Sequence, residues 1–133
     1  MIIVVGGSSQ GKLQYVLERE KAAGTEEVPS VFDAAVMQPE EIGQYRILNK
    51  VHLLIRGMMQ EQPESGEPEI RLQNYVNTHP DCILICDEVG SGVVPIDREE
   101  CEWREKVGRI MCHLTTQADE VDRVICGIAQ RIK

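Results

Sequence analysis

Residues 1–13 read MIIVVGGSSQGKL, and this stretch decides how the chain begins to fold. Residues 2–5, Ile-Ile-Val-Val, are β-branched and continuously apolar, which predicts a short strand buried on both faces. Two glycines follow directly, and a helical pattern begins with Leu13 and Val16. A strand, a glycine turn and a helix in this order predict an α/β unit whose turn lies at the carboxyl end of the strand.

The turn has the spacing G-x-x-x-x-G-K, with Gly6 and Gly11-Lys12 in the fixed positions. Glycines let the backbone curl around a phosphate, the helix N-terminus adds partial positive charge, and the lysine reaches the outer phosphates. We therefore expect the phosphates of GTP or ATP to be bound by the turn residues Gly6, Gly7, Ser8, Ser9, Gln10, Gly11, Lys12 and Leu13. The alternative is a glycine turn that only connects the strand to the helix.

Leu13 departs from the usual form of this motif. A Ser or Thr normally follows the lysine, and its hydroxyl binds the Mg²⁺ that bridges the β- and γ-phosphates. A leucine side chain has no oxygen with which to replace it. Phosphate binding and phosphoryl transfer are therefore separate hypotheses for this sequence.

Size and charge limit the class of protein. The 133 residues fit a single domain, 1–133, with 42% hydrophobic and 27% charged residues. The net charge of -8 argues against a nucleic-acid or anionic-membrane partner. No signal peptide or membrane span is expected, since the first apolar run is short and ends in glycine. Five cysteines, an odd number, favour a reducing cytoplasm.

The rest of the chain alternates between helical and strand patterns. We expect helices at 12–23, 39–60, 69–78 and 97–117, and strands at 28–35, 82–86, 121–126 and 128–132. The segment 39–60 is interpreted as one helix because Leu48, Val51 and Ile55 recur at helical spacing. His52 lies beside this stripe and is interpreted as structural. The alternation predicts a three-layer α/β domain with a mostly parallel sheet and a C-terminal edge hairpin.

Acidic residues follow two of the expected strands. Asp33 lies near the end of 28–35, and Asp87-Glu88 follow 82–86. Ligands of open α/β sheets bind at the carboxyl ends of the strands, where P-loop proteins hold a Mg²⁺-directing carboxylate. Asp33 and Asp87 are therefore two candidates for a metal-directing acid, and Glu88 is a candidate water-activating acid. A plain loop-facing role for Asp33 remains open.

A further set of residues carries a family resemblance. It comprises Glu88-Val89-Gly90, Gly92, Val94-Pro95, Arg98, Gly108-Arg109, Ala118-Asp119-Glu120-Val121, Gly127-Ile128 and Ile132-Lys133. With the N-terminal glycine turn, these residues resemble the bifunctional adenosylcobinamide kinase/adenosylcobinamide-phosphate guanylyltransferases of cobalamin biosynthesis. The resemblance covers both ends of the chain.

The resemblance implies a RecA-like P-loop fold and a homo-oligomer, usually a trimer. Family members phosphorylate the aminopropanol arm of adenosylcobinamide with a nucleoside triphosphate, and then transfer GMP from GTP through a histidine. Carried onto this chain, the resemblance implies that the triphosphate is bound by Gly6, Gly7, Gly11 and Lys12. Asp33 would replace the acid of the second-strand motif, and Glu88 would line the site.

The chain also departs from the family pattern. A long segment that carries the guanylylated histidine is replaced by residues 24–29, and no histidine of this chain matches it. The family's Asn-Gln pair is Met111-Cys112 here, and Leu13 replaces the metal-binding hydroxyl. We therefore expect a kinase-type, nucleotide-binding protein at most, without guanylyl transfer. The alternatives are a non-catalytic nucleotide-binding or complex-forming paralogue and a remnant with an empty P-loop.

Overall fold

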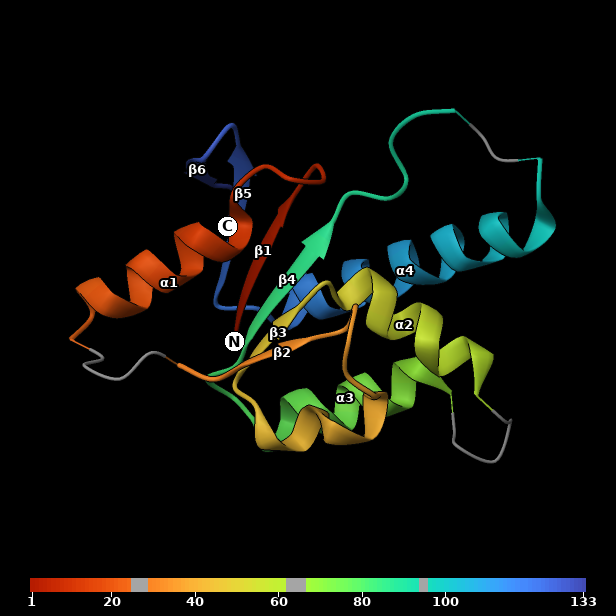
Figure 1. Ribbon diagram of the computed structural model, residues 1–133, viewed down its shortest axis with the longest axis horizontal. Coiled ribbons are helices and arrows are strands. Elements are labelled where there is room, and N and C mark those ends of the chain that lie inside the picture. The colour runs from red at the N-terminus through yellow and green to blue at the C-terminus, as the bar shows by residue number, and fades with distance from the viewer. Residues whose placement is uncertain (25–28, 62–66, 94–95) are drawn as a thin grey trace.

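A computed structural model describes residues 1–24, 29–61, 67–93 and 96–133 of the chain (Figure 1). In chain order the elements are β1 (Ile2–Gly6), α1 (Lys12–Ala22), β2 (Val31–Asp33), the 3₁₀ helix η1 (Pro39–Gln44), β3 (Ile47–Asn49), α2 (Val51–Gln60), α3 (Pro68–Thr78), β4 (Ile83–Asp87), α4 (Arg98–Gln117), β5 (Glu120–Ile125) and β6 (Ile128–Arg131). The described residues contain no helix with the length and apolarity that a membrane crossing needs.

One six-stranded sheet runs through the molecule in the order β2-β3-β4-β1-β5-β6. All neighbouring strands are parallel except β5 and β6, which form an antiparallel hairpin at the edge. The register places Ile2 of β1 opposite Ile83 of β4 and Glu120 of β5. The expected mostly parallel sheet with a C-terminal edge hairpin is therefore confirmed.

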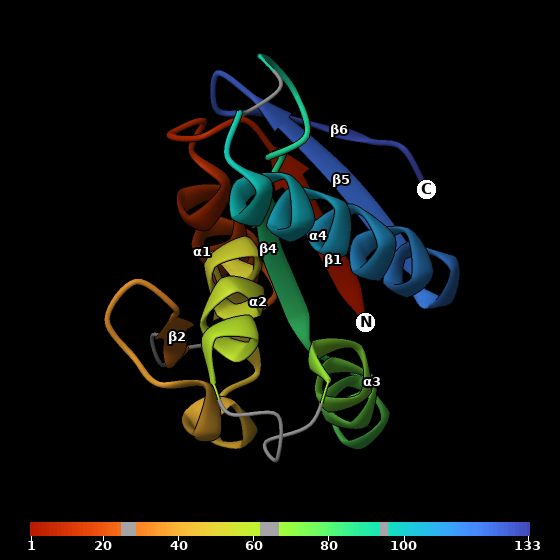
Figure 2. The same cartoon turned by 90° about the vertical axis from the view of Figure 1, so that its right-hand side faces the viewer.

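Helices cover both faces of the sheet, which gives three layers. Helix α1 covers one face, where Val16 packs against Val4 and Ile85. Helices α2, α3 and α4 lie on the other face, as the rotated view shows (Figure 2), where a larger cluster includes Leu54, Leu72 and Trp103. The central strands are apolar on both sides because both faces are covered.

The predicted helix over 39–60 is wrong. The segment divides into η1, strand β3 and helix α2. Tyr45 has extended backbone angles, and Lys50 has φ 61, which no residue inside a helix adopts. The side chains of Ile47 and Leu48 are fully buried on opposite faces of the sheet, and such a two-sided apolar pair fits helical spacing equally well.

The other elements lie within a few residues of their predicted positions. Strand β2 is shorter than expected, and Val28 lies outside the described residues, as do Val94-Pro95. Strand β4 ends on Asp87, one residue later than predicted. Helix α4 begins after Asp97, whose side chain accepts a hydrogen bond from the Glu99 N–H as an N-cap.

Candidate nucleotide-binding site

The glycine turn after β1 lies against the backbone of β5. Gly6 has φ 153, and a Cβ atom there would lie 2.3 Å from the carbonyl oxygen of Val124. Gly11 has φ 86 and ends the turn in the left-handed region, from which α1 starts. Two of the motif glycines are therefore required by backbone geometry alone, whatever the turn binds.

The turn is attached to the hairpin at the other end of the chain. Gln10 accepts two hydrogen bonds there: its carbonyl oxygen from the Gly127 N–H at 2.9 Å, and its side-chain Oε1 from the Cys126 N–H at 2.7 Å. The β5–β6 turn thus fixes the middle of the glycine turn. No local sequence pattern indicates this contact, because it joins residues more than a hundred positions apart.

Lys12 is the first residue of α1, and its side chain is only 6% exposed. Its ammonium donates to the Gly7 carbonyl oxygen at 2.6 Å and forms an ion pair with Asp87 Oδ1 at 2.7 Å. The lysine therefore lies back across the turn that precedes it and faces the carboxyl end of β4.

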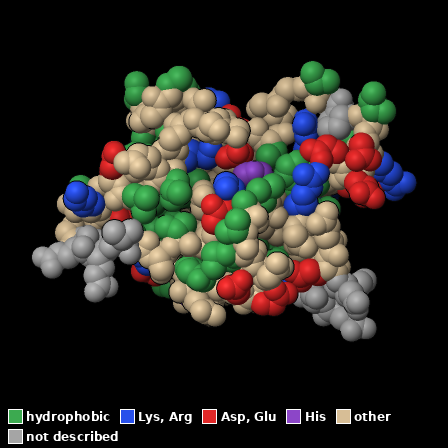
Figure 3. Space-filling model, viewed as in Figure 1, with side chains coloured by type: hydrophobic (Ala, Val, Ile, Leu, Met, Phe, Trp, Pro, Cys, Tyr) green, Lys and Arg blue, Asp and Glu red, His purple; other side chains and the backbone are tan. Residues whose placement is uncertain are grey.

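A cleft of about 320 Å³ lies beside this lysine. It is lined by Ser8, Ser9, Gln10, Gly11, Lys12, Leu13, Gln14, Asp33, Asn49, Lys50 and Asp87. Basic, acidic and histidine side chains gather near the centre of the face shown in Figure 3. The structure thus brings Asp33 and Asp87 to the same cleft as most of the glycine turn. Leu13 borders the cleft and packs partly against the cluster around α1.

Asp33 is held by a dense set of donors. Its Oδ2 accepts from Asn49 Nδ2 at 3.3 Å, its Oδ1 from the Ala35 N–H at 2.9 Å, and both oxygens lie 3.2 Å from the Lys50 ammonium. Burial disfavours the charged carboxylate, but the Ala35 and Lys50 contacts outweigh it and lower the pKa of Asp33.

Asn49 and Lys50 also line this cleft, and neither was predicted from the sequence. They end β3, and that strand was hidden inside the predicted helix. The available signal was the polar Asn-Lys pair directly after two apolar residues, since polar residues at strand ends mark the ligand edge of such sheets. The left-handed backbone of Lys50 makes the one-residue connection from β3 to α2.

His52 supports Asp87 from below the cleft. Its Nδ1 accepts the Asp87 N–H at 3.2 Å, its Nε2 lies 3.7 Å from Asp87 Oδ2, and its carbonyl oxygen accepts from Trp103 Nε1 at 2.8 Å. Burial lowers the pKa of His52, which favours the neutral ring that can accept this hydrogen bond. The contact with Asp87 was not apparent from sequence.

Glu88 lies outside this cleft. Its two carboxylate oxygens pair with Arg123 Nε and Nη2 at 2.7 and 3.0 Å. It lines a second cavity of about 270 Å³ together with apolar residues that include Val5 and Met111. Asp87 lines both cavities and is therefore their common wall.

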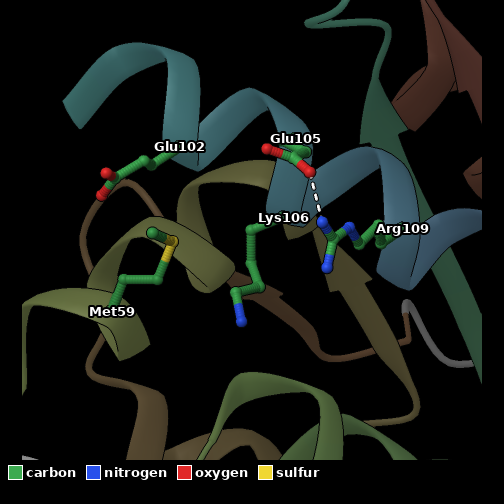
Figure 4. A pocket seen from close by; sticks show the side chains of 5 residues that line it. All are labelled: Met59, Glu102, Glu105, Lys106 and Arg109. Atoms are coloured by element: carbon green, nitrogen blue, oxygen red, sulfur yellow. Dashed lines mark hydrogen bonds and ion pairs between the residues drawn. The ribbon is translucent and has the colours of Figure 1, made fainter. Parts of the chain in front are cut away.

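Two other cavities contain no residue of the glycine turn. One of about 260 Å³ lies over α4 and α2, where Lys106, Arg109 and Glu105 gather (Figure 4). Arg109 pairs with Glu105, and Lys106 pairs with Glu67 and Glu69. The other, of about 590 Å³, is bordered by Arg56, which lies 4.1 Å over the ring of Trp103. Each charged side chain that lines the smaller of these two cavities has an oppositely charged partner.

The fold and the glycine turn define a protein of the P-loop NTPase class. A family model described as cobinamide kinase / cobinamide phosphate guanyltransferase matches residues 13–132. The chain belongs to this family.

One curated relative is the bifunctional adenosylcobalamin biosynthesis protein CobU of Salmonella typhimurium (strain LT2). This chain is 41% identical to it over 51 residues, which are 38% of this chain and 28% of the relative's length. The matched stretch thus spans less than a third of that protein. The activities of that protein are a hypothesis for this chain.

Proposed function

We propose that the chain binds the triphosphate of GTP or ATP in the cleft beside Lys12, and that it serves cobalamin nucleotide-loop assembly as a kinase-type transferase acting on adenosylcobinamide. The observation that carries this proposal is the convergence of the glycine turn, two lysines and two aspartates on one cleft. Family membership supports the substrate class, since the family model is described by cobinamide phosphorylation and guanylyl transfer.

Lys12 would exchange partners when the triphosphate binds. In the ligand-free chain its ammonium is neutralised by Asp87 and by the Gly7 carbonyl oxygen. The Gly7 carbonyl oxygen is a neutral acceptor, whereas phosphate oxygens carry negative charge and are stronger acceptors for an ammonium. The ammonium would therefore move from Gly7 toward the outer phosphates.

The acceptor alcohol would enter from the second cavity, which Asp87 shares with the cleft. Phosphoryl transfer forms a bond between the alcohol oxygen and the γ-phosphorus, breaks the bond to the β-phosphate, and releases the hydroxyl proton. Asp87 is the carboxylate that borders both cavities, so it is the group placed to accept that proton. Glu88 is already paired with Arg123 and is therefore not the group that we propose as the proton acceptor.

The residues of the cleft do not fit a tightly held Mg²⁺. Both oxygens of Asp33 already have donors, Asp87 Oδ1 is paired with Lys12, and Leu13 offers no oxygen. No three potential ligands among His, Cys, Asp and Glu cluster within the described ranges.

A non-catalytic nucleotide-binding paralogue is the second candidate function. Leu13 at the position of the metal-binding hydroxyl favours it, because phosphoryl-transfer enzymes of this class use the metal to neutralise developing charge. Both candidates require the same binding cleft. They differ only in whether adenosylcobinamide is phosphorylated.

Calorimetric titration with GTP and with ATP tests the shared step. We expect binding by the unmodified chain and a loss of affinity of about 10- to 100-fold or more in Lys12→Ala, because a charged hydrogen-bond donor to phosphate is removed. Lys106→Ala removes the same charge far from the cleft and should bind normally. Equal affinity in Lys12→Ala and the unmodified chain would refute the site.

Turnover separates the two candidates. Adenosylcobinamide is incubated with each triphosphate and its mass is followed. A product heavier by one phosphoryl group supports the kinase, and binding without any such product supports the non-catalytic paralogue.

A further inference from the structure

The cleft contains a second lysine that the glycine-turn motif does not include. Lys50 borders the cleft opposite α1, and 38% of its side chain is exposed. Each lysine of the cleft is paired with one aspartate: Lys12 with Asp87 and Lys50 with Asp33. Each pair has a net charge of zero, so the side chains that line the cleft add no surplus negative charge.

The position of Lys50 is fixed by its backbone. Its φ of 61 lies in the left-handed region, which is unfavourable for a residue that carries a Cβ atom. Its carbonyl oxygen accepts from the Leu53 and Leu54 N–H groups at 2.8 and 3.2 Å, and so begins α2. Strained residues that persist at a candidate site indicate a positional requirement.

The side chain of Lys50 is held by Asp33. The Lys50 ammonium contacts both carboxylate oxygens of Asp33. Asp33 in turn accepts hydrogen bonds from the Asn49 side chain and from the Ala35 N–H. An ammonium has three N–H donors. Two contacts with Asp33 leave at least one donor for a phosphate oxygen in the cleft.

We propose that the Lys50 ammonium takes the place of the metal ion at this site. Together with Lys12 it binds the outer phosphates of the triphosphate, so that binding needs no Mg²⁺. This inference rests on the proposed function. The positive charge of Lys50 would serve in place of the metal ion, whose usual hydroxyl ligand is absent at Leu13. Asp33 is then the group that positions Lys50.

The test is titration of the chain with inorganic tripolyphosphate and with GTP, each in EDTA and in excess Mg²⁺. For the unmodified chain we expect affinities that differ by less than about threefold between the two conditions. Lys50→Asn keeps a residue that tolerates the left-handed backbone and removes the charge. It should weaken binding in EDTA by about 10- to 100-fold. Lys50→Arg retains the charge and should lose much less.

Lys106→Ala is the matched control for loss of one positive charge, and far-ultraviolet circular dichroism with thermal unfolding checks that each variant folds. Binding that depends strongly on Mg²⁺ and is unchanged in Lys50→Asn would overturn this inference while leaving nucleotide binding intact. Absence of tripolyphosphate and GTP binding by the unmodified chain, with or without Mg²⁺, would overturn the inference and the proposed function together.

Discussion

Individual residues of the glycine turn meet two separate requirements: the close approach of the backbone to β5 and the phosphate binding that we propose. Gly6 lies where β1 meets β5, and no side chain fits between it and the Val124 carbonyl. Lys12 instead has a buried ammonium with a carboxylate partner. The first requirement concerns stability and the second concerns ligand binding, so substitutions at the two positions have different readouts.

Gly6→Ala should destabilise the fold by about 2–4 kcal/mol, because the new Cβ would lie 2.3 Å from a backbone oxygen and φ is positive. Urea unfolding measures the change. Gly108→Ala in α4 is the matched control: apart from its chain neighbours and the nearby backbone of α4, no atom lies within 4 Å of its Cβ position, and alanine should stabilise that helix by about 0.5–1 kcal/mol. A Gly6→Ala variant as stable as the unmodified chain would contradict the close approach.

At the level of elements, charged side chains attach α1 to the C-terminal hairpin. Arg19 of α1 pairs with Glu120 and with Asp122 Oδ2 at 3.1 Å, and Tyr15 donates to the same oxygen at 2.6 Å. Arg131 of β6 also pairs with Glu120 and with Asp122 Oδ1 at 3.4 Å. This network holds the helix that begins at the glycine turn.

Stability should therefore fall in acid. The hydrogen bond from Arg19 lowers the pKa of Glu120 from 4.5 to about 2. Because the pKa is lower in the folded chain, the stabilisation is present above about pH 4.5 and is lost as the pH falls toward 2. Urea unfolding from pH 6 to pH 3 should show this loss, and Glu120→Gln should reduce it. An identical pH profile for Glu120→Gln would contradict this contribution.

Sequence reasoning predicted β1, β4, α4 and the closing hairpin because each has a local signal: a β-branched run, a continuous apolar run, an N-cap or a glycine turn. It missed β3, whose three residues are too few for a period of two to be distinguished from a helical one. Asn49 and Lys50 were missed with it. Motif and strand-end rules concern local position, and they singled out Lys12, Asp33 and Asp87, which line the cleft.

Across the whole molecule, the cleft is assembled from chain segments that lie far apart in sequence. It is lined by the glycine turn and α1, by the ends of β2 and β3, and by Asp87 of β4. The C-terminal turn supports the glycine turn through Gln10. Contacts of this kind follow from strand order, which no local pattern specifies.

Ligand binding in the cleft should therefore change the rate of hydrogen exchange at the C-terminal turn. We expect GTP to slow hydrogen exchange at the Cys126 and Gly127 amides, which donate to Gln10. Hydrogen-exchange mass spectrometry of the chain with and without GTP measures this, with α3 as an internal reference outside the cleft. Protection confined to the glycine turn would contradict coupling between the turn and the hairpin.

A crystal structure of the chain with a non-hydrolysable GTP analogue examines the site itself. We predict that the β- and γ-phosphates lie within the glycine turn and that Lys12 Nζ has left the Gly7 carbonyl oxygen to bind them. An analogue bound elsewhere, with the Lys12 ammonium still on Gly7 and Asp87, would contradict the proposal that this turn binds a nucleotide.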